Sequence, residues 1–125
     1  ANKKGAMYRL THALADAGVD IRALVTNDSA EFGTIRMIVD QPDVAIDALN
    51  EAGYLCQLTD VIGVVIDDKV GGLDKLLADI DYMNISVDYI YICYDRLENK
   101  VIAVIHTDVE IEAILARKGW CIAGE

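Results

Sequence analysis

The sequence predicts an α+β fold made of two copies of one βαββαβ unit in tandem, each with an antiparallel sheet and its helices on one face. Three observations lead to this prediction: an internal repeat, alternating helix-like and strand-like apolar patterns, and glycines at matching places. The repeat appears at an offset of 66 residues (71 − 5 = 66), which sets Gly5 on Gly71 and Gly53 on Gly119. Apolar residues coincide at the same offset in the pairs Leu10/Leu76, Leu14/Ile80, Val19/Ile85, Ile21/Val87, Leu24/Ile90 and Ile38/Val104.

The length limits the size of each unit. The 125 residues divide into two small units, which we expect at residues 1–60 and 61–125. Units of roughly 60 residues bury only about 60% of the surface that their unfolded chains expose, so they are marginally stable alone. We therefore expect the two copies to pack against each other or against another chain.

The first copy shows the order α-β-β-α-β. Apolar residues follow the helical period from Gly5 to Ala17, and Gly18 ends this helix as a left-handed cap. A polar, glycine-ended segment over 27–33 predicts a hairpin connection, and Pro42 suits the first turn of a second helix. The expected elements are a helix over 5–17, strands over 19–26 and 34–40, a helix over 42–52 and a strand over 54–59.

The second copy shows the complete order β-α-β-β-α-β, which is the ferredoxin-like arrangement. Thr107 and Glu110 have the spacing of a capping box, in which both side chains bond free backbone amides at the start of a helix. The expected elements are a strand over 61–66, a helix over 73–83, strands over 85–93 and 101–106, a helix ending near 118 and a strand over 120–123.

The first copy lacks the opening strand that the second copy has. In this topology the first strand lies inside the sheet, so its absence would expose two strand edges. We expect either that the sequence belongs to a longer protein or that another segment fills the gap.

Composition and charge exclude several classes of protein. The net charge is −10 and the 11 basic residues are scattered, which argues against binding to nucleic acid. The longest apolar runs, over 61–66 and 101–105, are far shorter than the roughly 18 residues that a membrane span requires. No signal-peptide pattern opens the chain, so we expect no membrane association and a cytoplasmic location.

The cysteines and histidines predict no metal site. Cys56, Cys93 and Cys121 have no metal-type spacing and suit buried, reduced thiols. His12 and His106 are too few and too far apart in sequence to indicate metal ligands, so we interpret both as structural.

Each copy places a glycine loop before its first helix, at Asn2–Gly5 and at Asp68–Gly72. Glycine lets the backbone approach a ligand closely, and the free N–H groups of the helix favour a carboxylate or a phosphate. A plain strand-to-helix turn has the same pattern, so the loop alone does not establish a site.

These loops, together with two further stretches, resemble the ACT-domain family over essentially the whole chain. Residues 2–7 and 68–73 resemble the family's N-x-P-G-x-L loop, residues 17–21 its G-V-N-I step, and residues 32–39 its third strand. The resemblance implies a non-catalytic regulatory protein without a cofactor. It also implies domains that pair through their sheets, as in a homodimer, and bind a small ligand, usually an amino acid, at the seam.

The resemblance also implies which residues contact the ligand. Backbone amides of the glycine loop meet the ligand carboxylate, and the family's two Asn positions meet its polar groups. By position these residues are Asn2, Gly5, Ala6, Met7 and Asp20 in the first copy, and Asp68, Gly71, Gly72, Leu73 and Ser86 in the second.

The sequence departs from the family pattern at several of these places. A carboxylate at Asp20 would repel a ligand carboxylate unless it met an ammonium group. Only the first loop keeps the matching Asn, so we expect the first site to be the stronger one. The departures are Lys4 and Val70 in place of Pro, and Asp20, Asp68 and Ser86 in place of Asn.

Other side chains have both structural and functional interpretations. Tyr89 and Tyr91 share one face of a strand and could pack in the core or between sheets, or could meet a ligand or partner. Arg22 and Arg36 could pair with acids such as Asp20. The acids expected on solvated helix faces and caps are Asp43, Asp47, Glu51, Asp108, Glu110 and Glu112.

Catalysis is not expected. Nucleophilic catalysis needs a nucleophile beside a base, but the two histidines are unrelated in position and the sequence has no glycine-framed nucleophile. An acylphosphatase-type site would need an Arg in the first loop, where this chain has lysines. We therefore expect a regulatory protein that binds an amino acid. The alternative is an oligomerisation or interaction module without a ligand.

Overall fold

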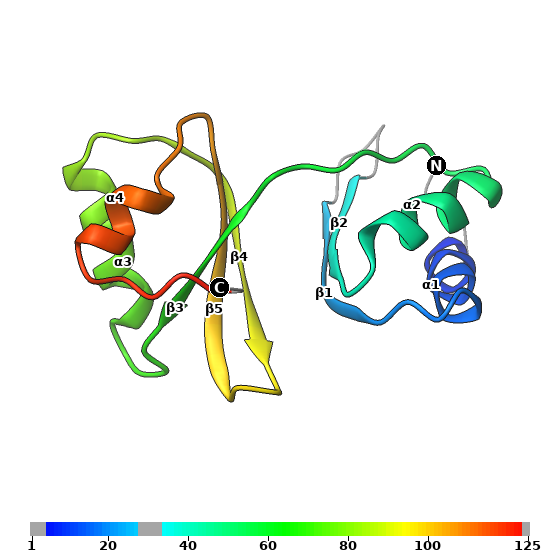
Figure 1. Ribbon diagram of the computed structural model, residues 1–125, viewed down its shortest axis with the longest axis horizontal. Helices are drawn as coiled ribbons and strands as arrows, with labels where there is room; N and C mark the ends of the chain where they lie inside the picture. The colour runs from blue at the N-terminus through cyan, green and yellow to red at the C-terminus, as the bar shows by residue number, and fades with distance from the viewer. Residues whose placement is uncertain (1–4, 28–33, 124–125) are drawn as a thin grey trace. The chain divides into compact units, whose positions relative to one another are not determined.

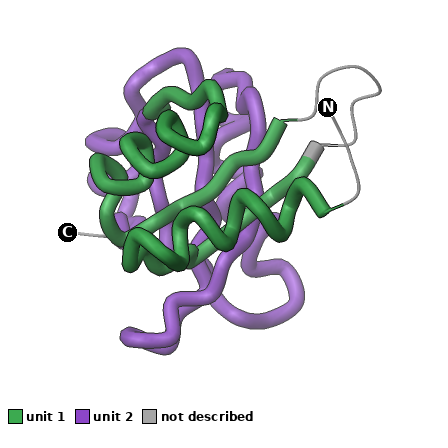
Figure 2. The backbone as a smooth tube through the Cα atoms, turned by 90° about the vertical axis from the view of Figure 1, so that its right-hand side faces the viewer, with its two compact units in different colours: residues 1–59 green, residues 60–125 purple. Residues whose placement is uncertain are grey.

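A computed structural model of the chain describes residues 5–27 and 34–123 (Figure 1). The chain divides into two compact units, residues 1–59 and 60–125 (Figure 2). Each unit has its own apolar core. The α+β fold with two small antiparallel sheets agrees with the predicted tandem ferredoxin-like units.

The first unit contains two helices and a two-stranded antiparallel sheet. Its elements are α1 (Ala6–Asp16), β1 (Ile21–Asn27), β2 (Thr34–Val39) and α2 (Pro42–Glu51). Pro42 opens α2, where its fixed φ and missing N–H cost nothing. Both helices lie on the same side of the β1–β2 sheet (Figure 1). The buried residues of the core are Leu10, Leu14, Val19, Ala45 and Leu49.

The second unit contains β3 (Ile62–Ile66), α3 (Gly72–Tyr82), β4 (Val87–Asp95), β5 (Lys100–Thr107) and α4 (Glu112–Arg117). Its strands are all antiparallel in the order β3-β5-β4, and Ile122 forms a bridge to Val64 on the outer edge of β3. This gives the strand order of a ferredoxin-like sheet. The core draws on β3, β5 and both helices, with Leu76, Ile105 and Leu115 fully buried.

The backbone repeats as the sequence does. Positive φ angles occur in three pairs at the offset of 66: Gly5 and Gly71 (83° and 86°), Gly18 and Asn84 (76° and 58°), and Gly53 and Gly119 (91° and 97°). These residues begin the first helix and end the first and second helices of each unit. L-residues other than Gly and Asn rarely adopt this conformation, so the repeated turns constrain the residue type.

The predicted strand over 54–59 is wrong, because the structure has no strand there. The equivalent segment of the second unit shows the reason. Cys121 and Ala123 hydrogen-bond only to β3, at 2.9 Å to the Val65 amide and 2.7 Å to the Gly63 carbonyl. The described residues of the first unit contain no counterpart of β3. Residues 54–59 therefore have no strand to pair with, and the predicted strand over 120–123 is reduced to the bridge at Ile122.

The predicted capping box is also wrong. Thr107 is the last residue of β5, paired with Val87, and α4 begins five residues later at Glu112. The Thr107 hydroxyl donates instead to the Val109 carbonyl at 2.6 Å, and α4 has no side-chain cap. Strand pairing thus extends through the position that the local pattern assigned to the helix.

In the described part of the chain, no helix combines the length and apolar character needed to cross a bilayer.

Candidate functional site

The first helix of each unit starts from a glycine in the left-handed conformation. Gly5 precedes α1 with φ 83° and ψ −1°, and Gly71 precedes α3 with φ 86° and ψ −2°. Each glycine carbonyl accepts the first helical hydrogen bond at 3.0 Å, from Arg9 and Lys75 respectively. No described side chain caps either start. Free N–H groups and the positive end of the helix dipole can therefore receive an anionic group.

The loop before α3 is closely packed at Gly72. A Cβ atom there would lie 2.1 Å from the Asp67 carbonyl oxygen. That same oxygen accepts the Lys69 amide at 2.9 Å, and the Gly72 amide donates to the Lys69 carbonyl at 3.0 Å. The second glycine of Gly71–Gly72 is thus required by a backbone contact, whereas the first is required by its φ angle.

The predicted site residues of the second unit fall into two groups. Asp68 and Gly71 are exposed beside the start of α3, with Gly72 buried and Leu73 partly buried behind them. Ser86 is exposed beyond the end of the same helix. An 11-residue helix is about 16 Å long, so one unit does not bring these groups together.

The first unit shows the same separation. Gly5 is exposed, Ala6 is partly buried and Met7 is exposed at the start of α1, whereas Asp20 lies beyond its end. Asn2 lies outside the described residues. In each unit the described residues that the sequence predicts to bind a ligand therefore form two groups, one at each end of the first helix, which we call half-sites.

The two helix starts differ in charge. Asp67, Asp68 and Asp74 surround the start of α3, and Lys69 lies 3.9 Å from the Asp67 carboxylate. The first turn of α1 has no acid, and the preceding sequence carries Lys3 and Lys4. A ligand carboxylate would meet like charges at the second start, whereas the first turn of α1 presents no acid.

Backbone hydrogen bonds fix the turn that carries Asp20. Its amide donates to the Asp40 carboxylate at 2.8 Å, and the Asp40 amide donates to the Asp20 carbonyl at 3.1 Å. The side-chain amide of Gln41 donates to the Gly18 carbonyl at 2.9 Å. The Asp20 carboxylate lies 3.8 Å from Arg22, which confirms the predicted pairing. This carboxylate is half exposed, so it can meet a further cation.

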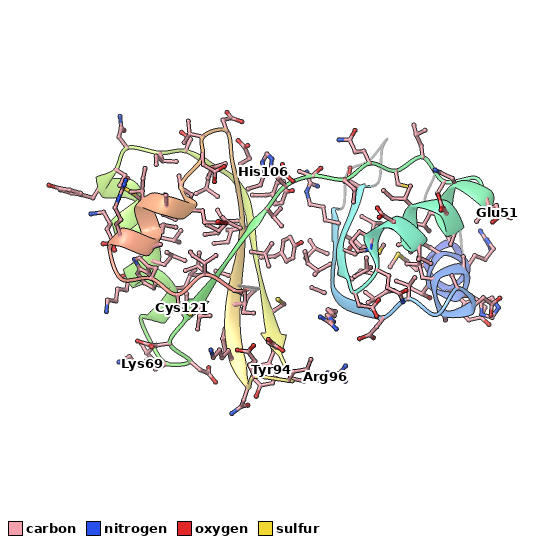
Figure 3. The ribbon with its side chains drawn as sticks, viewed as in Figure 1. Glu51, Lys69, Tyr94, Arg96, His106 and Cys121 are labelled. Carbon is pink, nitrogen blue, oxygen red and sulfur yellow. The ribbon has the colours of Figure 1, made fainter. Side chains whose placement is uncertain are left out.

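An open cavity of about 720 Å³ lies at the other end of the second unit, where no sequence pattern predicted a site. Figure 3 shows Lys69, before α3, and His106, near the end of β5, at opposite ends of the unit. The cavity combines His106 with acids that are far apart in the chain. Its polar lining includes Asp60, His106, Thr107, Asp108, Glu110 and Glu112.

The face of the second sheet away from α3 and α4 carries stacked rings. The Tyr89 and Tyr91 rings lie 6.4 Å apart and nearly parallel, and Tyr89 stacks on His106 at 5.0 Å. The shared face of the two tyrosines was predicted from their spacing and is confirmed. His106 Nδ1 lies 2.9 Å from the Asp88 carboxylate, which holds the imidazole at the strand end. On β4, the strand that carries Tyr89 and Tyr91, burial and then the charge of Asp95 raise the pKa of the Cys93 thiol.

The acids predicted to lie on solvated helix faces and caps are all exposed, but Asp108 and Glu110 precede α4 instead of lying on it. Asp43, Asp47 and Glu51 are exposed on α2, and Asp108, Glu110 and Glu112 are exposed around the start of α4. Across residues 5–27 and 34–123, no three His, Cys, Asp or Glu side chains gather as metal ligands would.

Comparisons with known proteins agree with this architecture. The family described as ACT domain pair matches residues 1–119. The crystal structure of protein BT0572 from Bacteroides thetaiotaomicron is similar to this chain with a TM-score of 0.85 and 28% sequence identity. The similarity covers 97% of this chain and 84% of that one. A search of curated proteins found no match.

Proposed function

The chain belongs to the ACT domain pair family, and we propose that it is a non-catalytic regulatory protein that binds an amino acid where one ACT-like unit meets another. The family supports a regulatory module for small molecules. The amino acid, the absence of catalysis and the pairing of units are our proposal. A cytoplasmic location stays a prediction from the sequence.

One observation carries the proposal: two uncapped helix starts repeat at the offset of 66, each opened by a left-handed glycine. Such a start presents several backbone N–H groups in one direction, and together they recognise a carboxylate. The absence of a Cβ at Gly5 and Gly71 leaves the approach to those groups open. An α-amino acid supplies the required carboxylate.

The separation of the half-sites supports binding between units. Because about 16 Å divides the two ends of the first helix, the start of one helix needs the end of another to complete a site. The proposed contacts at helix starts are Asn2, Gly5, Ala6 and Met7 in the first unit, and Asp68, Gly71, Gly72 and Leu73 in the second. The proposed contacts at helix ends are Asp20 and Ser86.

Charge favours the first helix start, and it favours Asp20 as the residue opposite. The start of α1 suits a carboxylate better than the acid-rich start of α3. Asp20 would then meet the ammonium group of the ligand, which resolves the repulsion expected from its departure from Asn. The start of α1 and Asp20 lie at opposite ends of the same helix in the first unit. Bringing them together around one ligand therefore requires the first units of two chains. We therefore propose a homodimer as the binding form.

Isothermal titration of the full chain against the twenty amino acids tests the proposal. We expect saturable heat for at least one amino acid and none for that compound with its carboxylate amidated. Absence of heat for all twenty at millimolar concentration would contradict it. Light scattering on the same samples reports whether the binding form is a dimer.

Two substitutions test the site itself. In Gly5→Asn the new residue tolerates the positive φ but adds a side chain at the start of α1. Binding should therefore weaken at least tenfold. Gly53→Asn imposes a similar change at φ 91°, with open space around it at the end of α2, and should leave binding unchanged. Circular dichroism checks that both variants fold. Equal binding by both variants would refute the role of Gly5.

The second candidate function is an interaction module without a ligand. The stacked Tyr89, Tyr91 and His106 rings on one sheet face favour it, because aromatic rings with polar atoms are typical of protein interfaces. It predicts an oligomer that is indifferent to metabolites. A strictly monomeric chain would exclude it.

A further inference from the structure

The turn that carries Asp20 is held from two sides. On the α1 side, the Val19 amide donates to the Leu14 carbonyl at 3.0 Å, and the Val19 side chain is buried in the first core. On the other side, Asp40 bonds both backbone groups of Asp20. The Asp40 carboxylate accepts the Asp20 amide at 2.8 Å, and the Asp40 amide donates to the Asp20 carbonyl at 3.1 Å. The Asp20 side chain therefore extends from a backbone that is fixed before any ligand arrives.

Gln41 adds a third bond to the same turn. It stands directly before Pro42, a place that favours extended backbone, and its φ is −134° and its ψ 80°. Its side-chain amide donates to the Gly18 carbonyl at 2.9 Å. Gln41 also occupies the cap position of α2, where Ser, Thr, Asp or Asn would satisfy a free amide, and no described side chain caps this helix. The position thus serves the 18–20 turn instead of the helix start.

A β-bulge turns Arg22 toward the Asp20 carboxylate. The pairing of β1 with β2 shifts between Ile21 and Ala23, which leaves Arg22 as the extra residue, and bulges commonly redirect a side chain. The Arg22 Nε atom lies 3.8 Å from Asp20 Oδ2. Asp40 therefore holds the backbone of Asp20 while a neighbouring cation directs its carboxylate.

The equivalent turn of the second unit is supported differently. The last pair of its ladder joins Val87 to Thr107, so Asp108 follows β5 as Asp40 follows β2. Yet no hydrogen bond in the described part of the chain joins Asp108 to Ser86, the helix-end contact of this unit. The Thr107 hydroxyl donates to the carbonyl two residues further along. The support by an Asp after the second strand thus accompanies a carboxylate at the contact position, and not a serine.

We propose that Asp40 and Gln41 are positioning residues for recognition of the ligand's ammonium group. They hold the 18–20 turn so that the Asp20 carboxylate meets that group already ordered. Because this order is established on folding, binding does not lose the conformational entropy a second time, and affinity rises. This assignment depends on the amino-acid site proposed above. It adds that a compound with the same carboxylate but no ammonium group gains nothing from Asp40.

Paired titrations of the full chain test this assignment. Each of the twenty amino acids is titrated, and one that binds is compared with its deamino analogue, the carboxylic acid that lacks the α-amino group. The wild type should prefer the amino acid by roughly tenfold or more. Asp40→Ala should weaken binding of the amino acid roughly tenfold and of the analogue less than about twofold, so the preference should disappear. Asp40→Asn should restore most of the affinity, because its side-chain oxygen still accepts the Asp20 amide.

Asp79→Ala is the matched control, because it also removes a carboxylate that accepts a hydrogen bond, here from the Trp120 indole at 2.7 Å. It should leave the preference unchanged. Circular dichroism checks that each variant folds. If Asp40→Ala does not fold, Gln41→Ala replaces it, and the preference should then fall roughly threefold.

Two results would overturn the role of these residues. If the variant weakens both compounds equally, or keeps the wild-type preference, Asp40 and Gln41 are structural only, and the amino-acid site stands without them. If the wild type binds none of the twenty amino acids, the proposed function fails and the positioning role fails with it. The wild-type titration alone distinguishes these two cases.

Discussion

The close packing of Gly72 against the Asp67 carbonyl gives the sharpest prediction for stability. In Gly72→Ala the new Cβ would lie 2.1 Å from that backbone oxygen, so the loop or the helix must move by about 1 Å to reach ordinary contact. Overpacking of this kind costs about 1–3 kcal/mol. The helix preference of Ala over Gly returns at most about 1 kcal/mol, and less at the first position of a helix. We therefore expect a loss of about 1–2 kcal/mol in the free energy of unfolding.

Urea unfolding followed by Trp120 fluorescence measures this loss in the second unit, to which Gly72 belongs. Trp120 is the only tryptophan of the chain and belongs to the core of the second unit. Gly71→Asn is the matched control: it adds a larger side chain at the neighbouring position, where no atom lies within 4 Å, and Asn tolerates the φ of 86°. It should cost less than Gly72→Ala. An unchanged urea midpoint for Gly72→Ala, or a larger loss of stability in Gly71→Asn, would contradict this prediction.

Two further predictions concern side chains of the second unit. Asp79→Ala removes the carboxylate that accepts the Trp120 indole N–H at 2.7 Å, and should lower the free energy of unfolding by about 1.5 kcal/mol, with Asp79→Asn intermediate in the same urea assay. Burial and the Asp95 charge raise the pKa of Cys93, so less thiolate forms near neutral pH, and iodoacetamide should modify Cys93 more slowly in the folded chain than in urea. Asp95→Asn should shift the pH profile of that modification to lower pH. Mass spectrometry of each cysteine measures this profile, and a shift to higher pH would contradict the prediction.

The fold was predictable from the sequence because glycine marks the same turns twice. The matching Gly5 and Gly71 begin helices, and Gly53 and Gly119 end them, all at positive φ. The third pair, Gly18 and Asn84, differs in residue type but not in conformation, since Asn is the residue besides Gly that most readily adopts positive φ. A strict search for repeated glycines would miss this pair, whereas the turn geometry reveals it.

The expectation of buried thiols was wrong for Cys121, which is exposed. The two errors in the predicted helices and strands arise from patterns whose meaning depends on distant partners. Residues 54–59 follow the second helix as a last strand would, but a strand at this place exists only through hydrogen bonds to an inner strand, as Cys121 and Ala123 show. Thr107 and Glu110 have capping-box spacing, but pairing with Val87 holds Thr107 in β5. In both cases tertiary pairing decides between local alternatives of similar free energy.

The cavity near His106 could not be predicted for a related reason. Asp60 and Glu112, which both line it, are 52 residues apart in sequence (112 − 60 = 52). The pairing of Ile62 with Ile105 brings their segments together. The acids were interpreted correctly one by one as exposed, but their common position depends on the register of β3 and β5.

The repeat preserves backbone geometry while charge distinguishes the two units. Gly5 and Gly71 differ by only 3° in φ (86 − 83 = 3), yet the start of α3 has Asp74 in its first turn and that of α1 has no acid. Equal backbone geometry means that N–H groups alone cannot make one unit prefer an anion, so any preference must come from the side chains. Under the function proposed above, acids at the second start would weaken carboxylate binding there without changing the turn, so the second unit would keep its fold even without a ligand.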